Sequence, residues 1–325
     1  MNRLIYTFRP VYKSTLWGGD RIASYKGETV GQSQVGESWE ISAVAGSESA
    51  VADGPDSGLT LSELCDKYGA ALLGADSVSR YGATFPLLVK IIDARQDLSV
   101  QVHPDDVLAK KRHGGFGKTE MWYVVDTEGD ARIACGLSRK VDPASLEDLV
   151  ARGEFRHCLA SHRSAPGDCF FIPAGRVHSI GAGNLLVEIQ QSSDITYRID
   201  DFGRRDADGN LRQLHIDLAK DAIDYSVKDD YRTRYEKKEN ADVSLVDCQY
   251  FKTDLVSLSP RHELKLPHVD SFRTVVCMEG EATVSADGQE PVVLRRGHSA
   301  LVAAEAVSLL ISAGNEGASL LVSHV

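Results

Sequence analysis

The chain has 325 residues, of which 42% are hydrophobic and 26% charged, an ordinary composition for a globular protein of about two domains. Its 36 Lys and Arg residues against 47 Asp and Glu give a net charge of −11, which argues against general nucleic-acid binding because that requires a basic surface. No apolar run is long enough to span a membrane, and residues 1–10 lack a secretory signal, so we expect a cytoplasmic protein with no membrane partner. The six cysteines show no CxxC spacing, so we expect reduced thiols.

In chain order, the first predicted element is a helix that begins at the capping box Thr60-Leu-Ser-Glu63. A second helix is predicted from Asp105 to Arg112, and a third after Asp142-Pro143, where Asp suits the N-cap and Pro the first helical position. Short β-branched runs that end at Gly, Pro or Asp predict strands at 85–92, 98–103, 121–125, 131–135, 169–172 and 185–190. The charged stretch 200–240 is typical of a solvated crossing between domains.

A weak internal repeat relates the two parts of the chain. Residues 123–133 align with 274–284, and residues 167–178 align with 297–308. The first copy is longer between these matches, where the helix after Asp142 is predicted. Two copies of one β-unit predict a mainly β protein with two jelly-roll β domains of the cupin type, the first carrying short helical insertions. We place these domains at residues 1–235 and 236–325.

Four residues of the first domain form a candidate metal site. Gln101 and His103 alternate in a predicted strand, so both side chains point to the same face. Glu120 opens the next strand, and His178 follows a turn. Two imidazoles, a carboxylate and an amide oxygen suit zinc or another divalent first-row ion, although a lone strand histidine is more often structural.

The second domain lacks this set. The repeat places Ser271 at the position of Glu120 and Ser308 at the position of His178. We therefore expect a degenerate C-terminal domain without metal ligands. Its remaining histidines are expected to be surface or structural residues, namely His262, His268 and His298.

Several motifs resemble those of the type I mannose-6-phosphate isomerases (phosphomannose isomerases), in their short bacterial form. They are Leu-Ser-Val-Gln-Val-His-Pro-Asp at 98–105, Gly-Lys-Thr-Glu at 117–120, Pro-Ala-Gly-Arg-Val-His at 173–178, Trp-Gly-Gly at 17–19, Gly-Glu-Ser-Trp-Glu-Ile-Ser at 36–42, and the spacing from Glu188 through Arg198 to Arg204. The resemblance implies a zinc-dependent cupin enzyme, with one Zn²⁺ per chain, that interconverts mannose 6-phosphate and fructose 6-phosphate.

The resemblance also assigns roles to residues of this chain. It implies that Gln101, His103, Glu120 and His178 bind the metal, that Arg198 and Glu188 are catalytic, and that Ser99 lies on the phosphate side. Lys118 is expected to act in catalysis and substrate binding. Arg204 stands where the longer enzymes have Lys, a change that keeps the charge and alters the geometry.

Aldose–ketose isomerisation requires the same residue types for chemical reasons. A proton leaves the carbon beside the carbonyl and returns to the neighbouring carbon, through an enediol(ate) whose negative oxygen a metal or Arg198 can stabilise. The base remains open between Glu188, a zinc-bound hydroxide and Lys118. Ser99, Lys118, Arg198 and Arg204 supply donors for the phosphate. The expected partner is a small phosphosugar, and the chain is expected to be a monomer or a weak homodimer.

Two other functions stay open from the residues alone. One is a different metal-dependent cupin enzyme, such as a dioxygenase, which would use two histidines and one carboxylate. The other is a non-catalytic sugar-binding cupin. The Gln101 ligand and the basic residues favour a phosphosugar over an oxygenase substrate. The intact metal ligands and the intact Glu188 and Arg198 pair argue against a non-catalytic cupin.

Overall fold

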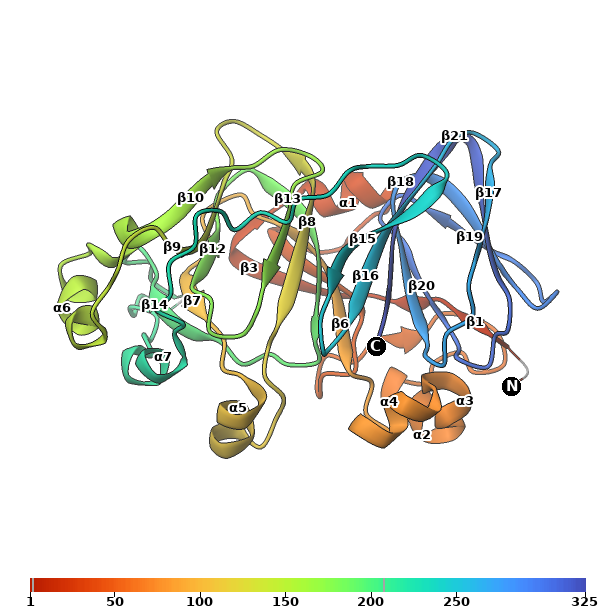
Figure 1. Ribbon diagram of the computed structural model, residues 1–325, viewed down its shortest axis with the longest axis horizontal. Helices are drawn as coiled ribbons and strands as arrows, with labels where there is room; N and C mark the ends of the chain where they lie inside the picture. Colours follow the sequence, from red (N-terminus) through yellow and green to blue (C-terminus); the bar gives the residue numbers. More distant parts are fainter. Residues whose placement is uncertain (2, 207) are drawn as a thin grey trace.

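The computed structural model describes residues 1, 3–206 and 208–325. With 41% of residues in strands and 16% in helices, the molecule is mainly β, as predicted. Two β bodies lie side by side along the long axis, and short helices gather along one edge and at one end (Figure 1). Within the described residues, no helix is long and apolar enough to cross a membrane.

The N-terminal body is a sandwich of two antiparallel sheets. The six-stranded sheet has the order β11-β8-β13-β6-β4-β3, and the five-stranded sheet has the order β10-β9-β12-β7-β14. Side chains such as Trp122, Phe170 and Ile180 fill the space between them. The strands are β3 (Val11–Gly19), β4 (Val35–Ile41), β6 (Leu87–Asp93), β7 (Val100–Val102), β8 (Glu120–Thr127), β9 (Arg132–Leu137), β10 (Leu159–Arg163), β11 (Cys169–Ile172), β12 (His178–Ile180), β13 (Asn184–Gln191) and β14 (Tyr197–Asp200).

The C-terminal body is built on one eight-stranded sheet with the order β1-β20-β18-β21-β16-β15, to which β17 and β19 add as branches. Its strands are β1 (Ile5–Tyr6), β15 (Ala241–Asp247), β16 (Lys252–Leu258), β17 (Glu263–Leu266), β18 (Arg273–Ala286), β19 (Val292–Arg295), β20 (Ser299–Val302) and β21 (Leu309–His324). Because β1 pairs with β20, the first strand of the chain belongs to this sheet. The division at 235/236 falls in the connection before β15, and it stays a proposal.

The six-stranded sheet is covered on both faces. One face packs on the five-stranded sheet, and the other contributes Val89 and Val187 to the core that holds Leu255 and Leu320 of the C-terminal body. Strands buried on both faces are mostly apolar, and β6 is apolar apart from Lys90 and its last residue, Asp93. The two bodies therefore share one hydrophobic core.

All three predicted helices form. Thr60 and Glu63 make a complete capping box at the start of α2 (Leu61–Tyr68). Asp105 caps α5 (Asp106–His113), and Asp142 caps the 3-10 turn η1 (Pro143–Ser145) that leads into α6 (Leu146–Ala151). The other helical segments are α1 (Arg21–Lys26), α3 (Ala70–Leu73), α4 (Ala75–Tyr81), η2 (Phe155–Cys158) and α7 (Ile216–Ala222), and a two-stranded ribbon joins β2 (Phe8–Arg9) to β5 (Ala50–Val51).

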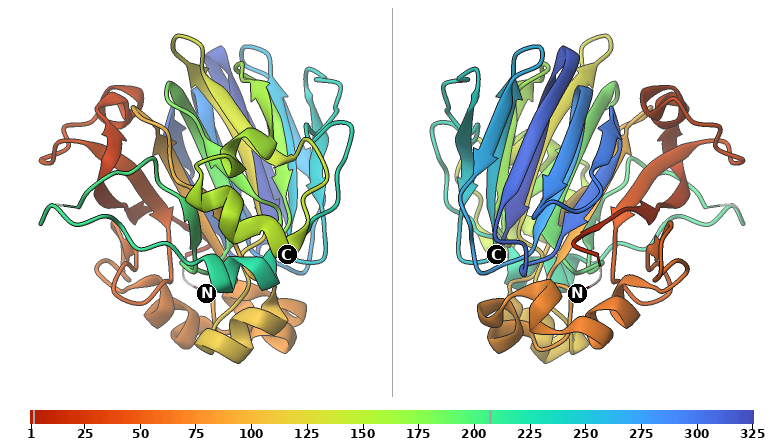
Figure 2. Two further views of the ribbon diagram at one scale, coloured as in Figure 1. Left: turned by 90° about the vertical axis from the view of Figure 1, so that its left-hand side faces the viewer. Right: turned by 90° about the vertical axis from the view of Figure 1, so that its right-hand side faces the viewer.

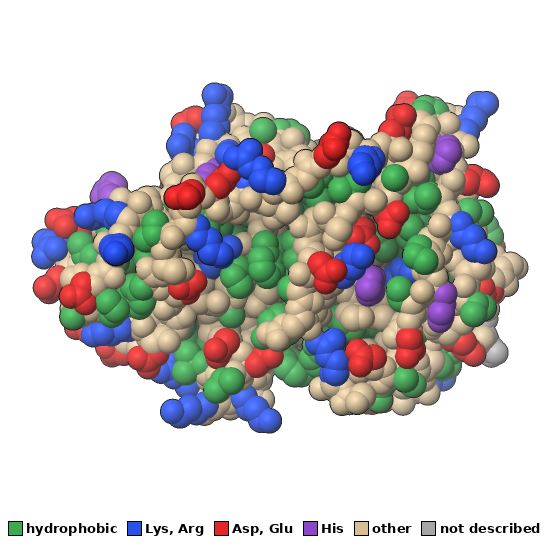
Figure 3. Space-filling view, viewed as in Figure 1, with side chains coloured by type: hydrophobic (Ala, Val, Ile, Leu, Met, Phe, Trp, Pro, Cys, Tyr) green, Lys and Arg blue, Asp and Glu red, His purple; other side chains and the backbone are tan. Residues whose placement is uncertain are grey.

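The repeat corresponds to similar strand arrangements in the two bodies. The first copy runs from β8 in the six-stranded sheet through a turn into β9 in the five-stranded sheet. The second runs along β18, a single long strand with two register irregularities near Gly280. The charged stretch 200–240 begins at the last residue of β14, and its other described residues form α7 and loops that lead to β15. Figure 3 shows acidic and basic side chains interspersed over one face of the molecule.

Candidate active site

Three of the predicted site residues form one row across the five-stranded sheet. His178 in β12 is the register partner of Gln101 in β7, and Gln101 is the partner of Arg198 in β14. Directly opposed residues of antiparallel strands point to the same face, so the three side chains share one face of the sheet. Antiparallel pairing thus brings together residues that are far apart in the sequence.

A second row lies on the six-stranded sheet. Glu188 in β13 is paired with Trp122 in β8 on one side and with Lys90 in β6 on the other, and Lys90 is paired with Trp39 in β4. The Trp122 indole Nε1 donates to Glu188 Oε2 at 2.7 Å, and Lys90 Nζ lies 3.4 Å from Glu188 Oε1. The sandwich therefore encloses charged side chains from both of its sheets.

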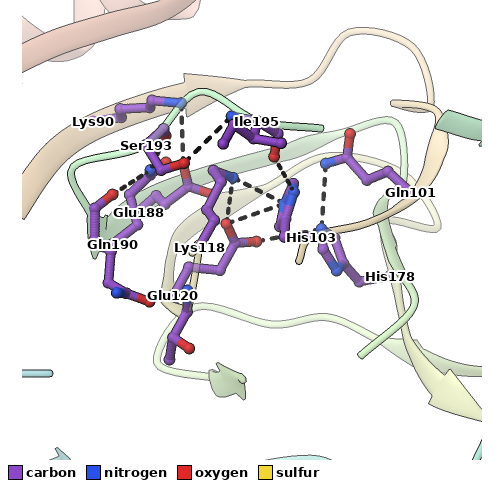
Figure 4. A network of polar contacts seen from close by, with 12 residues as sticks. Lys90, Gln101, His103, Lys118, Glu120, His178, Glu188, Gln190, Ser193 and Ile195 are labelled. Atoms are coloured by element: carbon purple, nitrogen blue, oxygen red, sulfur yellow. Dashed lines mark hydrogen bonds and ion pairs between the residues drawn. The ribbon is translucent and has the colours of Figure 1, made fainter. Parts of the chain in front are cut away.

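His103, Glu120 and His178 converge in the interior of the sandwich (Figure 4). Their potential ligand atoms all lie within 4.8 Å of one another. His103 Nε2 is 3.4 Å from Glu120 Oε2, and His178 Nε2 is 3.3 Å from Glu120 Oε1. Gln101 Nε2 is 3.3 Å from His178 Nε2, which brings the fourth predicted ligand to the group.

The hydrogen bonds of this group fit a divalent metal ion. His103 Nδ1 donates to the Ile195 carbonyl and His178 Nδ1 to the Arg176 carbonyl, which leaves both Nε2 lone pairs directed at Glu120. Glu120 Oε1 is buried and accepts no hydrogen bond from any described residue. Tetrahedral ligands at zinc distances lie about 3.3 Å apart, close to the observed spacings. Rotating the Gln101 amide by half a turn would direct its oxygen, instead of its nitrogen, toward His178 Nε2, and an amide oxygen can bind a metal ion.

Lys118 lies against the same group. Its Nζ donates to His103 Nε2 at 2.9 Å and to Glu120 Oε2 at 2.5 Å. Gly117 places it there, because a Cβ at Gly117 would come within 2.6 Å of the Asp105 and Asp106 backbone. A metal ion bound to His103 requires the Lys118 ammonium to turn away from Nε2.

Burial and charge keep both imidazoles neutral and the carboxylate ionised, the forms that bind metal. Burial, reinforced by Lys118, lowers the pKa of His103 to about 3, and burial also lowers the pKa of His178. Burial alone would raise the pKa of Glu120. Lys118 and the two imidazoles outweigh that effect and hold the pKa of Glu120 well below its usual value.

Glu188 and Lys90 form a buried pair in which the pKa of both groups is raised. Burial raises the pKa of Glu188, and the charge of Glu120 raises it further. Burial would lower the pKa of Lys90, but Glu37 and Glu188 together raise it. Glu188 Oε1 accepts no hydrogen bond from the described residues, so it can take a proton from a bound molecule.

A cavity of about 380 Å³ opens beside this group. Its lining includes five predicted site residues, namely Ser99, Gln101, Lys118, Glu188 and Arg198. It also includes residues that the sequence analysis did not select, namely Glu37, Lys90, Asp194 and Arg212. The fully buried His103, Glu120 and His178 do not line it; Gln101 and Lys118 contact them from its wall.

Two predicted phosphate-side residues differ in their placement. Arg198 lines the cavity, its Nη1 donates to the Gln213 carbonyl at 2.9 Å, and its buried Nε has no partner among the described residues. Burial, reinforced by Arg212, lowers the pKa of Arg198. Arg204 does not line the cavity, and its guanidinium is bonded to Asp201 and to the Asp97 carbonyl.

One sequence signal could have identified Lys90. It is the only charged residue between Phe85 and Ile92, and a lone lysine in an apolar run buried on both faces needs a buried partner. Glu37 and Arg212 carry no comparable signal, because each lies among other polar residues. Only the pairing of strands and loops places them at the cavity.

The arrangement combines a metal-ligand group, a proton acceptor with a raised pKa and a basic wall in one polar cavity. Such a set suits proton transfer on an oxygen-rich, negatively charged small molecule.

Comparisons with known proteins agree with this chemistry. The model of the type I phosphomannose isomerase catalytic domain matches residues 5–134. Mannose-6-phosphate isomerase ManA of Bacillus subtilis (strain 168) is 39% identical over 277 residues, which cover 84% of this chain and 85% of that protein. Mannose-6-phosphate isomerase of Streptococcus mutans is 34% identical over 291 residues, covering 87% of each chain.

Solved structures show the same fold. The crystal structure of the mannose 6-phosphate isomerase from Bacillus subtilis superposes with a TM-score of 0.88 at 29% identity, covering 99% of this chain and 100% of that one. A phosphomannose isomerase structure from Salmonella typhimurium, at 17% identity and a TM-score of 0.78, covers 99% of each chain and shows the likeness of fold alone.

Proposed function

Because this chain belongs to the type I phosphomannose isomerase family, we propose that it interconverts mannose 6-phosphate and fructose 6-phosphate with one zinc ion held by Gln101, His103, Glu120 and His178. The proposal rests on one observation. The His103–Glu120–His178 group lies beside a cavity whose lining includes Glu188 and Arg198. A divalent ion, when bound, supplies Lewis acidity toward the carbonyl and hydroxyl oxygens of the sugar.

The proton transfer is assigned to Glu188 and Lys118. Glu188 Oε1 takes the proton from the carbon beside the sugar carbonyl and returns it to the neighbouring carbon, with an enediolate between the two steps. The raised pKa of Glu188 brings it closer to neutral pH, where a general base works best. Lys118, beside Glu120, gives a proton to the oxygen that becomes a hydroxyl and takes one back from the oxygen that becomes the new carbonyl, so that no net proton is gained or lost.

The phosphate is assigned to the other wall of the cavity. Ser99 supplies a hydroxyl, and Arg198 supplies a guanidinium with a buried, unpartnered Nε among the described residues. Charge-assisted hydrogen bonds of this kind are about twice as strong as neutral ones. The fourth residue expected there, Arg204, is already bonded to protein groups.

A coupled assay tests the proposal. The protein as purified, supplemented with zinc, should convert mannose 6-phosphate to fructose 6-phosphate and show no comparable rate on free mannose. Equal rates on the two sugars would contradict the phosphate assignment. Oxygen consumption without isomerisation would favour a dioxygenase-like cupin, and tight sugar binding without turnover would favour a non-catalytic one. A cytoplasmic location and a monomeric or weakly dimeric state remain predictions from the sequence.

A further inference from the structure

The loop that joins β14 to α7 places two arginines, Arg204 and Arg212, on one carboxylate, that of Asp201, beside Arg198 of β14. We propose that Arg212, held in place by Asp201, completes the phosphate site with Arg198. Arg204 holds the loop in position through its bonds to Asp201 and Asp97 and does not bind the phosphate. The inference rests on the proposed function, because the phosphate is that of the sugar substrate.

The placement of the arginines separates their roles. Arg198 and Arg212 both line the cavity beside the metal-ligand group, and Arg204 does not. Figure 2 shows the loop that carries Arg212 extending beyond the sheets on the same side as β3 and α1. Residues of β3 and β4, including Thr15, Trp17 and Glu37, form the facing wall of the cavity.

Each of the three guanidinium nitrogens of Arg204 already donates to a protein oxygen, which leaves two of its five N–H groups, one on each Nη. Its Nε donates to the Asp201 carbonyl, its Nη1 to the Asp97 carbonyl at 2.6 Å and its Nη2 to Asp201 Oδ1 at 2.5 Å. Its guanidinium also lies 5.5 Å from the centre of the Phe202 ring. A guanidinium with every nitrogen engaged has little left to offer a phosphate.

Arg212 has the opposite pattern. Its Nη1 lies 3.2 Å from Asp201 Oδ1 and 3.3 Å from Oδ2, and its Nε and Nη2 have no partner among the described residues. Arg198 likewise donates through Nη1 alone from its side chain, to the Gln213 carbonyl. Each arginine is thus anchored by one nitrogen and keeps a pair of nitrogens for a planar, two-point contact with phosphate oxygens.

Asp201 is suited to positioning these residues. Its side chain is 4% exposed and contacts both Arg204 and Arg212. Arg204 and Arg212 on this one carboxylate keep a net positive charge next to Arg198, and a phosphate monoester carries a charge of close to −2 near neutral pH. Asp201 therefore orders the cluster without cancelling its attraction for the ligand.

Steady-state kinetics on arginine variants test the assignment. Arg212→Gln should raise the KM for mannose 6-phosphate by roughly 10- to 100-fold, the effect of losing hydrogen bonds to a charged group, with a much smaller change in kcat. Arg212→Lys should recover only part of the loss, and Arg204→Gln should raise KM by a smaller factor than Arg212→Gln. Arg205→Gln is the matched control, since Arg205 lies in the same loop and is exposed, and among the described residues its side chain bonds only the Gly209 carbonyl.

A double variant tests the positioning role of Asp201. Asp201→Asn should raise KM, and adding it to Arg212→Gln should raise KM no further, because both changes remove the same contact. Thermal melting of each variant identifies any that fail to fold. If Asp201 were merely structural, the two changes would add and the melting temperature would account for the loss.

Calorimetric titration with inorganic phosphate separates this inference from the proposed function. The protein as purified should bind phosphate, and Arg212→Gln should weaken that binding far more than Arg204→Gln. A reversed order would overturn the assignment of Arg212. A protein that binds phosphate with the expected order but does not isomerise mannose 6-phosphate would overturn the proposed function and support the phosphate site.

Discussion

Glu120 illustrates how single residues define the site, because it is fully buried and yet ionised. A buried carboxylate is costly unless cations or donors surround it, and here Lys118 and two imidazoles do so. Oε1 still lacks a donor among the described residues. The residue therefore identifies a position where a positive charge stabilises the fold.

The first residue-scale prediction concerns the imidazoles. His103→Ala or His178→Ala should remove most of the bound metal and the activity together, because the remaining ligands hold zinc much less well. Metal analysis and isomerase assays on the same preparation measure both. His157→Ala is the control, since His157 is an exposed histidine of η2 outside the group. Full activity in a ligand variant without measurable metal would refute the site.

The second residue-scale prediction separates Arg198 from the metal. Arg198→Ala should keep about one metal ion per chain and raise the KM for mannose 6-phosphate, because Arg198 is assigned to the phosphate. A second role at the enediolate oxygen, expected from the sequence, predicts in addition a fall in kcat of roughly 10²–10³, the scale for losing one oxyanion donor. Arg198→Lys should rescue only in part, because an ammonium does not reproduce the planar guanidinium. A surface salt bridge would instead cost at most about 1 kcal/mol of stability and nothing in rate. A wild-type kcat would therefore leave the chemistry to Glu188 and Lys118.

Helices and strands differ in how far the sequence determines them. The helix starts at Thr60, Asp105 and Asp142 were predicted correctly because a cap is a contact between residues three or fewer positions apart. The position of Lys90 beside Glu188 depends on the register of β6 and β13, which no local pattern reveals. The Gln101 and His103 pair was accessible because alternation within one strand is local.

In the basic loop after β14, too, a local sequence pattern does not reveal which residues come into contact. Arg204 and Arg212 are both arginines in a charged stretch, and the resemblance to the isomerase family assigned Arg204 by its distance from Arg198. The contacts of Asp201 distinguish them, and those contacts depend on how the loop folds back on itself between 201 and 212.

Asp56 provides a test at the scale of packed elements. Its carboxylate accepts hydrogen bonds from Tyr6 of β1 at 3.1 Å and from Lys67 and Tyr68 of α2 at 2.6 and 2.9 Å. Burial alone would raise the pKa of Asp56, but Lys67 and the tyrosine hydroxyls outweigh it and hold the pKa below its ordinary value. The ionised form of the Asp56 carboxylate therefore stabilises the packing of α2 against β1.

We expect Asp56→Asn to lower the free energy of unfolding by about 1–3 kcal/mol at pH 7, the cost of disrupting hydrogen bonds to a charged group. A lowered pKa means that the stabilisation is complete above the ordinary Asp pKa of about 3.9 and is lost as the pH falls through the folded-state value. Urea unfolding at several pH values should show the difference from wild type shrinking toward acid. Asp66→Asn, an exposed change on α2, should show no such trend.

At the scale of the whole molecule, the shared core predicts cooperative unfolding. Leu320 lies in the C-terminal body but packs in the same core as Val89 and Val187 of the six-stranded sheet. All three tryptophans, Trp17, Trp39 and Trp122, belong to the N-terminal body, so their fluorescence reports on that body alone.

Leu320→Ala should lower the free energy of unfolding by about 2–5 kcal/mol, as for other large-to-small core changes. Because the core is continuous, tryptophan fluorescence and circular dichroism should report one shifted transition in urea. An unchanged tryptophan midpoint beside a second, earlier transition in circular dichroism would show that the bodies unfold independently.

The shared core also shapes how the enzyme would respond to random mutation. Residues of the C-terminal body supply neither a metal ligand nor a wall of the catalytic cavity, yet they support the sheet that carries Glu120 and Glu188. In a growth selection that depends on the isomerase, inactivating changes in β16, β18 and β21 would be common and temperature-sensitive. Cooling the culture would restore growth for those alleles, whereas alleles at Glu120 or His178 would fail at every temperature.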